Sequence, residues 1–410
     1  MTTHQRSVVV FITLTVLIDT AGLGIIFPVL PGLIARLGHT DISTAASYGG
    51  WLSFVYAAMQ FVFAPVLGNL SDAWGRRPVL LCSLLGFSLD YLLLAFAPNL
   101  YWLFIGRTIS GITGASYVTG ATYMADISTG DDRTKNFGIL NAAMGIGFIV
   151  GPALGGLLGQ YGTHLPFIAT AALGLLNFIL GYFVLPESLV PANRRPFSWK
   201  KANPLGALQH LRQFPGIRWL LAAILCLSFA QHSMETIWSY FTIQKFGWTI
   251  QLIGLSLGIL GVLYVLSQAW LVGRMLTRLK DTRTAFTGLI FTCAAFLCFA
   301  LCSWQGGLFI GILLMAIGSV AETALQGMLS NQTPASEQGA LQGSAGALKG
   351  IITVIAPPFL AHAFAVSTGQ HTWFYFPGMP FLIAAAAVLL SIVLLRKNSR
   401  TPPVTPGKTV

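Results

Sequence analysis

Charge is what this sequence has least of. Asp, Glu, Lys and Arg together make up 9% of its 410 residues, whereas an ordinary soluble domain contains about 25%. So small a charged fraction cannot cover the surface of a water-soluble protein, which excludes a soluble enzyme, a nucleic-acid-binding protein and a disordered chain. Cysteine is also rare, and the five cysteines all lie in apolar stretches, so that no disulfide framework is predicted: Cys82, Cys226, Cys293, Cys298 and Cys302.

Sequence patterns of common catalytic and cofactor-binding sites are missing as well. His and Cys residues do not cluster at metal-ligand spacing, and no G-x-x-x-x-G-K-[ST] sequence is present. The first absence argues against a metal site, and the second argues against ATP hydrolysis through a P-loop. No nucleophile stands with a base in an arrangement typical of an enzyme. We therefore expect no enzymatic activity, no metal and no cofactor.

Hydrophobic residues, by contrast, make up 55% of the chain, and its mean hydropathy is +0.73. They fall in runs of about 20 residues, each long enough to cross the hydrocarbon core of a membrane as a helix. The first run is too long for the apolar region of a signal peptide, so we interpret it as a span. Twelve spans are predicted, near residues 7–35, 46–70, 78–97, 100–124, 136–160, 164–185, 216–244, 251–273, 284–303, 307–330, 340–366 and 373–395.

A polar stretch, Pro186–Pro215, separates the first six spans from the last six. The sequence predicts an all-α membrane protein with twelve transmembrane helices in two pseudo-symmetric six-helix halves. The expected parts are an N-terminal bundle over 1–190, a cytoplasmic linker with a short surface helix over 191–215, a C-terminal bundle over 216–400 and a tail over 401–410.

The basic residues predict the orientation of the chain in the membrane. If both termini are cytoplasmic, 19 of the 23 Lys and Arg residues face the cytoplasm and only Arg36 and Lys245 face outward. Cytoplasmic loops of membrane proteins carry just such an excess of Lys and Arg. The net charge of +11 is therefore interpreted as a topology signal rather than as a nucleic-acid-binding surface. We expect a multi-pass protein of the cell inner membrane.

The two halves resemble each other in sequence. The stretch Gly68–Arg77 follows the second span, and Gly273–Arg283 follows the eighth span 205 residues later. Gly151-Pro152 in the fifth span and Ala356-Pro357 in the eleventh are separated by the same 205 residues. Duplicated halves with a site between them are typical of secondary transporters.

Three motifs indicate a transporter family. Gly68-x-x-x-Asp72-x-x-Gly75-Arg76-Arg77 combines glycines that allow a tight turn with an acid that suits an arginine or a helix N-terminus. Arg107-x-x-x-Gly111 places in the fourth span a guanidinium that needs a partner or a water cavity. Gly151-Pro152-x-x-Gly155 in the fifth span bends a helix and lets another approach closely, so helix packing alone is an alternative explanation for it. We expect Gly68, Asp72, Gly75, Arg76, Arg77, Gly151, Pro152 and Gly155 to take part in gating.

With these motifs, and with Ile18-Asp19-Thr, Phe61-Val-Phe-Ala-Pro65 and Leu185-Pro-Glu187-Ser, the whole chain resembles the tetracycline/proton antiporters of the major facilitator superfamily. The resemblance implies export against inward proton flow by alternating access. It carries over to Asp19, Asp72, Asp90 and Arg107, which match the charged positions of that family. Tyr264 and Thr292 stand where the family carries a histidine and an acidic residue, which leaves the substrate open.

Six ionisable residues fall well inside the spans, where each costs about 3 kcal/mol unless it finds a partner or water; they are Asp19, Asp90, Arg107, Glu235, Glu322 and Lys349. We assign proton coupling to these six. Glu322 and Lys349 lie at similar depth and are expected to pair, and Arg107 has Asp19 or Asp90 as its partner. His232 is either a further proton-binding residue or a hydrogen-bonded structural residue.

Gln231, Glu235 and Trp238 share one helix face, which suits a cavity for an amphipathic or cationic molecule. The predicted cavity residues are Tyr56, Gln60, Tyr117, Gln231, Glu235, Trp238, Tyr264, Gln268 and Gln326. The expected partners are a small-molecule substrate, protons and the lipid bilayer, with no nucleic acid, and the expected state is a monomer driven by the proton gradient. The alternatives are a proton-driven nutrient importer and a non-transporting receptor or scaffold.

Overall fold

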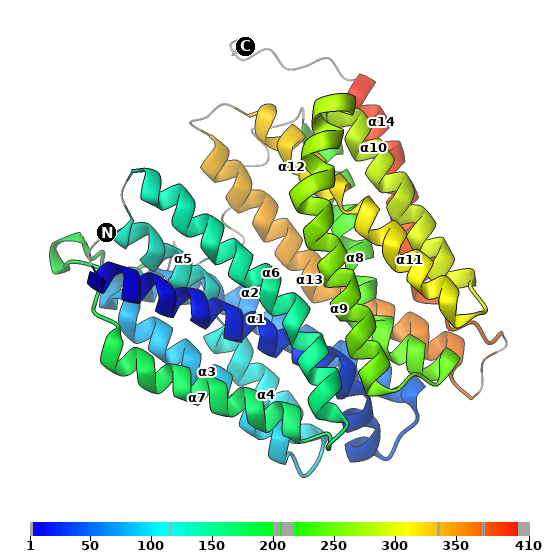
Figure 1. Cartoon of the computed structure of the whole chain (residues 1–410), viewed down its shortest axis with the longest axis horizontal. Coiled ribbons are helices and arrows are strands. Elements are labelled where there is room, and N and C mark those ends of the chain that lie inside the picture. The colour runs from blue at the N-terminus through cyan, green and yellow to red at the C-terminus, as the bar shows by residue number, and fades with distance from the viewer. Residues whose placement is uncertain are drawn as a thin grey trace. The chain divides into compact units, whose positions relative to one another are not determined.

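The computed structural model describes residues 3–114, 116–128, 130–199, 203, 206, 217–333, 337–370, 372 and 374–400. Almost all of these residues are helical, and no strand occurs among them (Figure 1). Contacts between residues divide the chain into two compact units. Unit 1 comprises Met1–Pro204 and Trp248–Gly261, and unit 2 comprises Leu205–Gly247 and Val262–Val410.

Unit 1 contains the first six predicted spans. Its helices are α1 (Thr3–Gly38), α2 (Ile42–Trp74), α3 (Arg76–Phe96), α4 (Leu100–Thr113), α5 (Ser116–Ile127), α6 (Asp131–Gly159) and α7 (Leu165–Val184), followed by the 3-10 turn η1 (Pro191–Asn193). Helix α1 packs along α6, α3 packs on α7 and α4, and α2 packs on α4. The side chains of Asp41 and Asn99 cap α2 and α4 by accepting backbone N–H groups of Thr44 and Tyr101, each at 3.1 Å.

Unit 2 is also a helix bundle. The remaining helices of the chain are α8 (Arg218–Phe246), α9 (Ile250–Leu266), of which the part up to Gly261 belongs to unit 1, a π-helical segment η4 (Ser267–Leu271), α10 (Val272–Leu301), α11 (Gln305–Gly318), α12 (Val320–Asn331), α13 (Gln338–Thr368) and α14 (Met379–Arg400). Helix α8 is central, because it packs against α12, α13 and α14. Helix α10 packs against α11, α12 and α14.

Ten stretches among the described residues are long and apolar enough to span a membrane. One of them, Ile250–Leu301, has 52 residues and contains two spans, because the backbone leaves the helical conformation at Lys280 (φ 63°, ψ 167°). The fourth predicted span is interrupted near Gly114, which leaves α4 and α5 individually too short to qualify. Among the described residues, counting Ile250–Leu301 as two spans and α4 with α5 as one span gives twelve spans. This is the number that the sequence predicts.

The start of the last predicted span differs from the structure, and the predicted linker helix falls largely outside the described residues. The last helix was expected to begin near residue 373, but α14 begins at Met379, because Pro377-Gly378 breaks the apolar run. The surface helix expected in the linker cannot be compared over its whole length, since most of residues 200–216 lie outside the described residues. The described part of the linker contains the turn η1 and, at Gly206, one further residue in 3-10 conformation.

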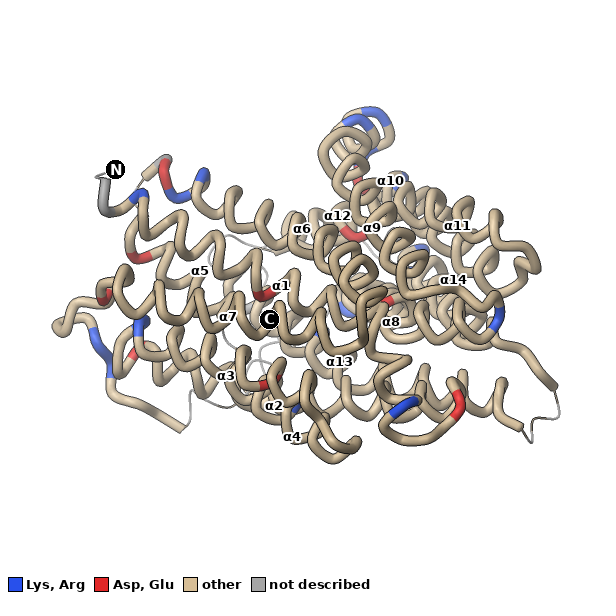
Figure 2. The backbone as a smooth tube through the Cα atoms, turned by 60° about the horizontal axis from the view of Figure 1, so that its bottom comes forward, with Lys and Arg blue, Asp and Glu red and all other residues tan. Residues whose placement is uncertain are grey.

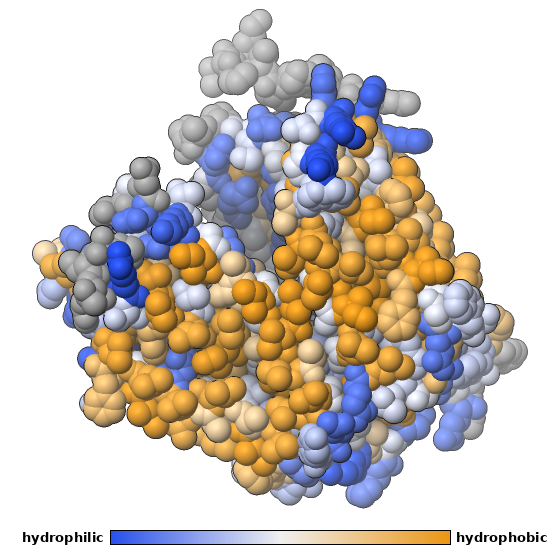
Figure 3. Space-filling view, viewed as in Figure 1, coloured by the Kyte–Doolittle hydropathy of each residue, from blue (hydrophilic) through white to orange (hydrophobic). Residues whose placement is uncertain are grey.

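The surfaces of the helices are suited to lipid. Large apolar side chains are exposed on both units, among them Leu176 and Phe183 in unit 1 and Leu266, Ile290 and Leu389 in unit 2. Figure 3 shows the broad apolar surface that such side chains form. Most Lys and Arg residues lie near helix ends, and only a few charges fall in the middle of a helix (Figure 2). Those few charges form the sites described next.

Candidate functional site

A buried ion pair lies within unit 1. Arg107 of α4 donates a hydrogen bond from Nη2 to Oδ2 of Asp90 on α3, and both residues are buried. The rings of Tyr56 and Tyr91 lie 5.7 and 5.8 Å from the guanidinium carbon, close enough for cation–π attraction. Of the two partners that the sequence left open for Arg107, the structure selects Asp90 rather than Asp19.

Asp19 lies in a cavity beside this pair. The cavity is lined by Asp19 of α1 together with aromatic and small polar side chains, including Tyr56, Phe87, Tyr91 and Ser110. Among the described residues Asp19 has no ion-pair partner. Asp19 is thus an intramembrane carboxyl without an ionic partner among the described residues, whereas the guanidinium of Arg107 is already neutralised by Asp90.

Two further predicted cavity residues in unit 1 make specific hydrogen bonds. Gln60 donates from Nε2 to the carbonyl oxygen of Gly114 at 3.0 Å, where α4 ends, and to the hydroxyl of Tyr56 at 3.2 Å. Its amide thus satisfies backbone polarity that the helix break exposes. Tyr117 is 38% exposed and donates its hydroxyl to Oδ1 of Asn141 at 3.1 Å, which joins α5 to α6.

Unit 2 contains a second ion pair and a second pocket. The ion pair expected between Glu322 of α12 and Lys349 of α13 is present, with Nζ 3.3 Å from Oε1. Gln231 of α8 donates to the other carboxylate oxygen of Glu322 at 3.3 Å. These three polar residues and the apolar Ile224, Leu227 and Leu325 line one pocket. The pocket therefore offers both signs of charge beside an apolar wall.

Other predicted cavity residues surround Glu322. Gln268 accepts a hydrogen bond from the hydroxyl of Thr323 at 3.0 Å. Tyr264 lies near Gln268, four residues later in the chain, and near Glu322. Gln326 is partly buried one helical turn after Glu322 on α12. Several polar residues that the sequence predicts to line a cavity thus lie close together in unit 2. The sequence did not predict which of them contact each other.

Trp238 was wrongly predicted to line the cavity. Its side chain is 1% exposed and packs among Phe241, Phe299 and Phe381, with ring centroids 6.4, 5.0 and 6.3 Å away. Trp238 does share a helix face with Gln231, but seven residues carry it about 10 Å further along the axis. At that depth the face meets aromatic side chains of α10 and α14 instead of the pocket.

Glu235 does not line the pocket of unit 2, although its side chain is accessible. It is 54% exposed and contacts Nδ1 of His232 at 3.0 Å. Thr292, at the position where the resembling family carries an acid, is buried and donates its hydroxyl to the carbonyl of Gly288 at 3.0 Å. A Cβ at Gly318 of α11 would touch Thr292, so this position packs two helices together rather than lining a pocket.

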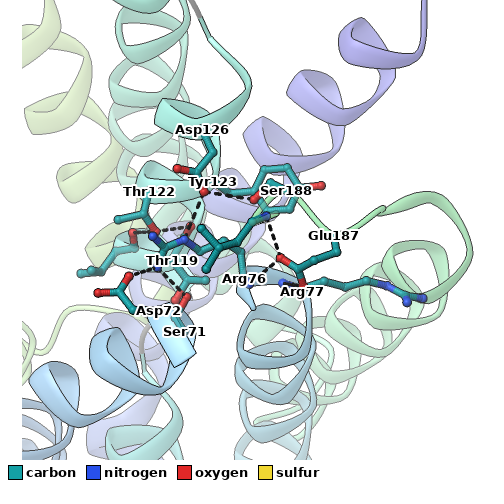
Figure 4. Close-up of polar contacts among 12 residues, drawn as sticks. Ser71, Asp72, Arg76, Arg77, Thr119, Thr122, Tyr123, Asp126, Glu187 and Ser188 are labelled. Carbon is teal, nitrogen blue, oxygen red and sulfur yellow. Dashed lines mark hydrogen bonds and ion pairs between the residues drawn. The ribbon is translucent and has the colours of Figure 1, made fainter. Parts of the chain in front are cut away.

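The motif Gly68–Arg77, which comprises the end of α2 and the start of α3, forms a compact polar cluster (Figure 4). Arg76 contacts Asp72 at 2.5 Å and Asp126 of α5 at 3.1 Å, and it also donates to the hydroxyl of Ser71 at 3.1 Å. Gly75 joins α2 to α3 with φ 115°, a conformation that favours glycine. The arginine that the sequence offered as a partner for Asp72 is therefore Arg76, which ties α2 to α5.

Glu187 belongs to this motif cluster, although the sequence analysis gave it no role. Its carboxylate accepts the backbone N–H groups of Arg76 at 2.8 Å and Arg77 at 3.2 Å, which are the first two residues of α3. A carboxylate at a helix N-terminus satisfies free N–H groups and complements the helix dipole. Arg77 extends to the carbonyl of Tyr182 at 2.6 Å. The sequence offered one signal for this role, namely that Glu187 follows Pro186 directly after the sixth predicted span.

The glycine-proline motif packs α6 against α1. A Cβ on Gly151 would come within 2.9 Å of the Cα of Gly24, and a Cβ on Gly155 would come within 2.6 Å of the carbonyl oxygen of Ile25. Pro152 lies against Gly24 as well. Gly68, by contrast, has open space at the position that a Cβ would occupy. Close packing thus accounts for the small residues of α6, in agreement with the packing alternative.

Comparison with known proteins places the chain in a transporter family. Residues 12–305 and 233–409 match the family model of the Major Facilitator Superfamily. The chain belongs to this superfamily, as its helix bundles and intramembrane ion pairs suggest. Within the described residues, no group of three or more His, Cys, Asp or Glu side chains could hold a metal ion.

Two curated relatives show which members of the superfamily the chain is similar to. The chain is 37% identical to the class C tetracycline resistance protein of Escherichia coli over 94% of its own length and 95% of the relative's. It is 35% identical to the class H tetracycline resistance protein of Pasteurella multocida over 97% and 98% of the two chains. The chain is thus a membrane transporter related to the tetracycline resistance proteins.

Solved structures agree with the fold. A bacterial homologue of the human lysosomal transporter Spinster matches with a TM-score of 0.80 at 14% identity, covering 99% of this chain and 100% of that one. A D-xylose-proton symporter matches with a TM-score of 0.73 at 18% identity, covering 99% of each chain. At such low identity these matches establish the shared fold alone.

Proposed function

We propose that this chain is a proton-coupled antiporter that exports a small amphipathic drug-like or metabolite substrate by alternating access. The similarity to tetracycline resistance proteins over nearly the whole chain carries the proposal. We further propose a multi-pass location in the cell inner membrane with both termini in the cytoplasm, a monomeric state, and no cofactor apart from the proton gradient.

The arrangement of intramembrane charges supports proton coupling. Arg107 and Lys349 each already have a carboxylate partner, in Asp90 and Glu322. This leaves Asp19 without a basic partner among the described residues, whereas Glu235 is paired with His232. Because an isolated carboxylate is costly inside a membrane, such an acid gains by taking up a proton or a cationic group of a substrate. Competition between the two would make the exchange obligatory.

The pocket of unit 2 supports an amphipathic substrate. Gln231, Glu322 and Lys349 offer hydrogen bonds and both charges, while Leu227 and Leu325 offer apolar contact. Tetracycline is not a necessary substrate, because Tyr264 and Thr292 replace the histidine and the acid of the resembling family. Thr292 is also buried and does not line the pocket.

The test is a tolerance screen in a bacterium that lacks its major drug exporters. Expression of the chain is expected to raise tolerance to tetracycline or to other amphipathic antibiotics, and a protonophore is expected to abolish the accompanying decrease in cellular accumulation. The control variant is Asp19→Asn, which should be produced in the membrane at the same level but confer no tolerance. A protein that increases accumulation of the compound instead would be an importer, and the proposal would be wrong.

A further inference from the structure

A hydrogen-bonded chain of three side chains lies in unit 2 next to the pocket that Gln231, Glu322 and Lys349 line. His232 of α8 contacts Oε2 of Glu235 through Nδ1 at 3.0 Å and the hydroxyl of Thr353 on α13 through Nε2 at 3.2 Å. The Thr353 hydroxyl is also 3.0 Å from the carbonyl oxygen of Lys349. Both ring nitrogens of this histidine are therefore engaged, by partners on two helices.

The two partners differ in what they can do with a proton. An ionised carboxylate only accepts hydrogen bonds, so Glu235 holds a proton on Nδ1 of His232. A hydroxyl both donates and accepts, so Thr353 fits Nε2 whether or not that nitrogen carries a proton. The geometry thus fixes one ring nitrogen and leaves the other free to change its protonation state.

The hydroxyl of Thr353 has a position for each state. When Nε2 carries a proton, it donates to Thr353, and the hydroxyl donates to the carbonyl of Lys349. When Nε2 is bare, the hydroxyl turns and donates to Nε2 instead. Neither state leaves a buried polar atom of the ring without a partner, so the proton is bound and released without breaking the packing between α8 and α13.

We infer that His232 is a proton-binding site of unit 2, with Glu235 fixing the Nδ1–H tautomer and Thr353 as the partner of the titrating Nε2. A proton on Nε2 changes the charge of the His232–Glu235 pair from −1 to zero. The inference rests on the proposed function, because it supplies a proton site beside the pocket. Gln231, the residue before His232, donates to Glu322 in that pocket.

The charged surroundings are compatible with this assignment. The helices packed against α8 are α12, α13 and α14. Of these, α12 contributes Glu322 and α13 contributes Lys349, and the two neutralise each other at 3.3 Å. On α14, Lys397 stacks on Trp219 at 5.0 Å, about 20 Å from His232 along α8. His362 lies about 13 Å beyond Thr353 along α13. The net charge next to His232 is therefore that of Glu235.

The experiment is a pH titration of the full-length protein in lipid nanodiscs, labelled with nitrogen-15 in its histidine rings. Seven histidines contribute signals, and the His232→Asn variant identifies those of His232 by their loss. Between about pH 5 and about pH 9 the Nε2 signal should move from the protonated to the bare position while Nδ1 stays protonated. Loss of the Nδ1 proton, or no movement of Nε2 in this range, would overturn the inference.

Variants of the two partners test their separate roles. Glu235→Gln should release the fixed tautomer, so that the Nδ1 signal also moves with pH. Thr353→Val removes the partner of Nε2 and should shift its titration, whereas Thr353→Ser should restore the wild-type curve. His362→Asn removes an exposed histidine of the same unit and should leave the His232 signals unchanged. Unaltered His232 signals in both Glu235→Gln and Thr353→Val would refute the assigned roles.

The titration does not depend on transport. If the proposed antiport is wrong, the wild-type protein will show no export coupled to inward proton flow, yet the His232 signals will still titrate as described. If instead transport is proton-driven but Nε2 of His232 does not titrate, the proposed function stands and the proton site lies elsewhere.

Discussion

Removing the acid from the buried pair Asp90–Arg107 should cost more stability than removing the base. In Asp90→Ala the guanidinium of Arg107 remains, with 8% of its side chain exposed, and it cannot lose its charge. In Arg107→Ala the carboxyl of Asp90 remains, with 0% of its side chain exposed, but it can take up a proton and become neutral. The two variants therefore differ although they delete the same contact.

The magnitudes follow from burial. Breaking a buried ion pair by removing one partner costs about 3–5 kcal/mol. In Asp90→Ala the rings of Tyr56 and Tyr91 remain 5.7 and 5.8 Å from the guanidinium carbon, so the charge keeps a partial partner and the cost lies at the lower end of that range. We expect Asp90→Ala to lower the free energy of unfolding by about 3 kcal/mol and Arg107→Ala to lower it by about 2 kcal/mol. The double variant should cost no more than Asp90→Ala alone, because no unpaired charge is left.

The assay is equilibrium unfolding of the purified protein in mixed micelles, with all four members of the cycle measured together. Single costs that simply add in the double variant would show that the two side chains do not interact. A cost below about 1 kcal/mol for Asp90→Ala would show that Arg107 reaches water or another acid. Either result would refute the reasoning from burial.

Two glycine substitutions test the packing of unit 1 in the same unfolding assay. Gly75→Ala should lower the free energy of unfolding by at least about 1 kcal/mol, because φ is 115° and the new Cβ meets the Glu187 carboxylate. The control Gly68→Ala has open space around its new Cβ and should leave the free energy of unfolding unchanged. Gly151→Ala should lower the free energy of unfolding by about 1–3 kcal/mol, because its Cβ meets the backbone of α1. The control Gly145→Ala meets nothing within 4 Å. Equal effects of Gly151→Ala and Gly145→Ala would contradict the close approach of α1 and α6.

The spans and one ion pair could be predicted because they depend on quantities that the sequence contains. Apolar run length gives the spans, and it fails only where a local break decides, as at Gly114 and before Met379. Glu322 and Lys349 were paired because residue counting placed them at similar depth on consecutive spans. Depth in the membrane allowed both Asp19 and Asp90 as the partner of Arg107. The packing of α4 on α3 determines that the partner is Asp90.

Contacts that depend on helix rotation or on distant segments could not be predicted. Trp238 lies on the same face of α8 as Gln231, but further along the helix than the pocket, among aromatic rings of α10 and α14. Thr292 was aligned with a functional position, but its side chain faces Gly318 between two helices. Glu187 caps α3 more than 100 residues away in sequence, which no local pattern reveals. His232 was left with two interpretations because its partner Thr353 lies on another helix.

Proton exchange is the central claim, and proteoliposomes test it most directly. The purified protein is reconstituted with a pH indicator inside the vesicles, and a compound to which expression confers tolerance is supplied as a gradient without any imposed pH difference. The account predicts that movement of the compound into the vesicles drives protons out, and that Asp19→Asn abolishes both fluxes. Movement of the compound at an unchanged internal pH would contradict the account.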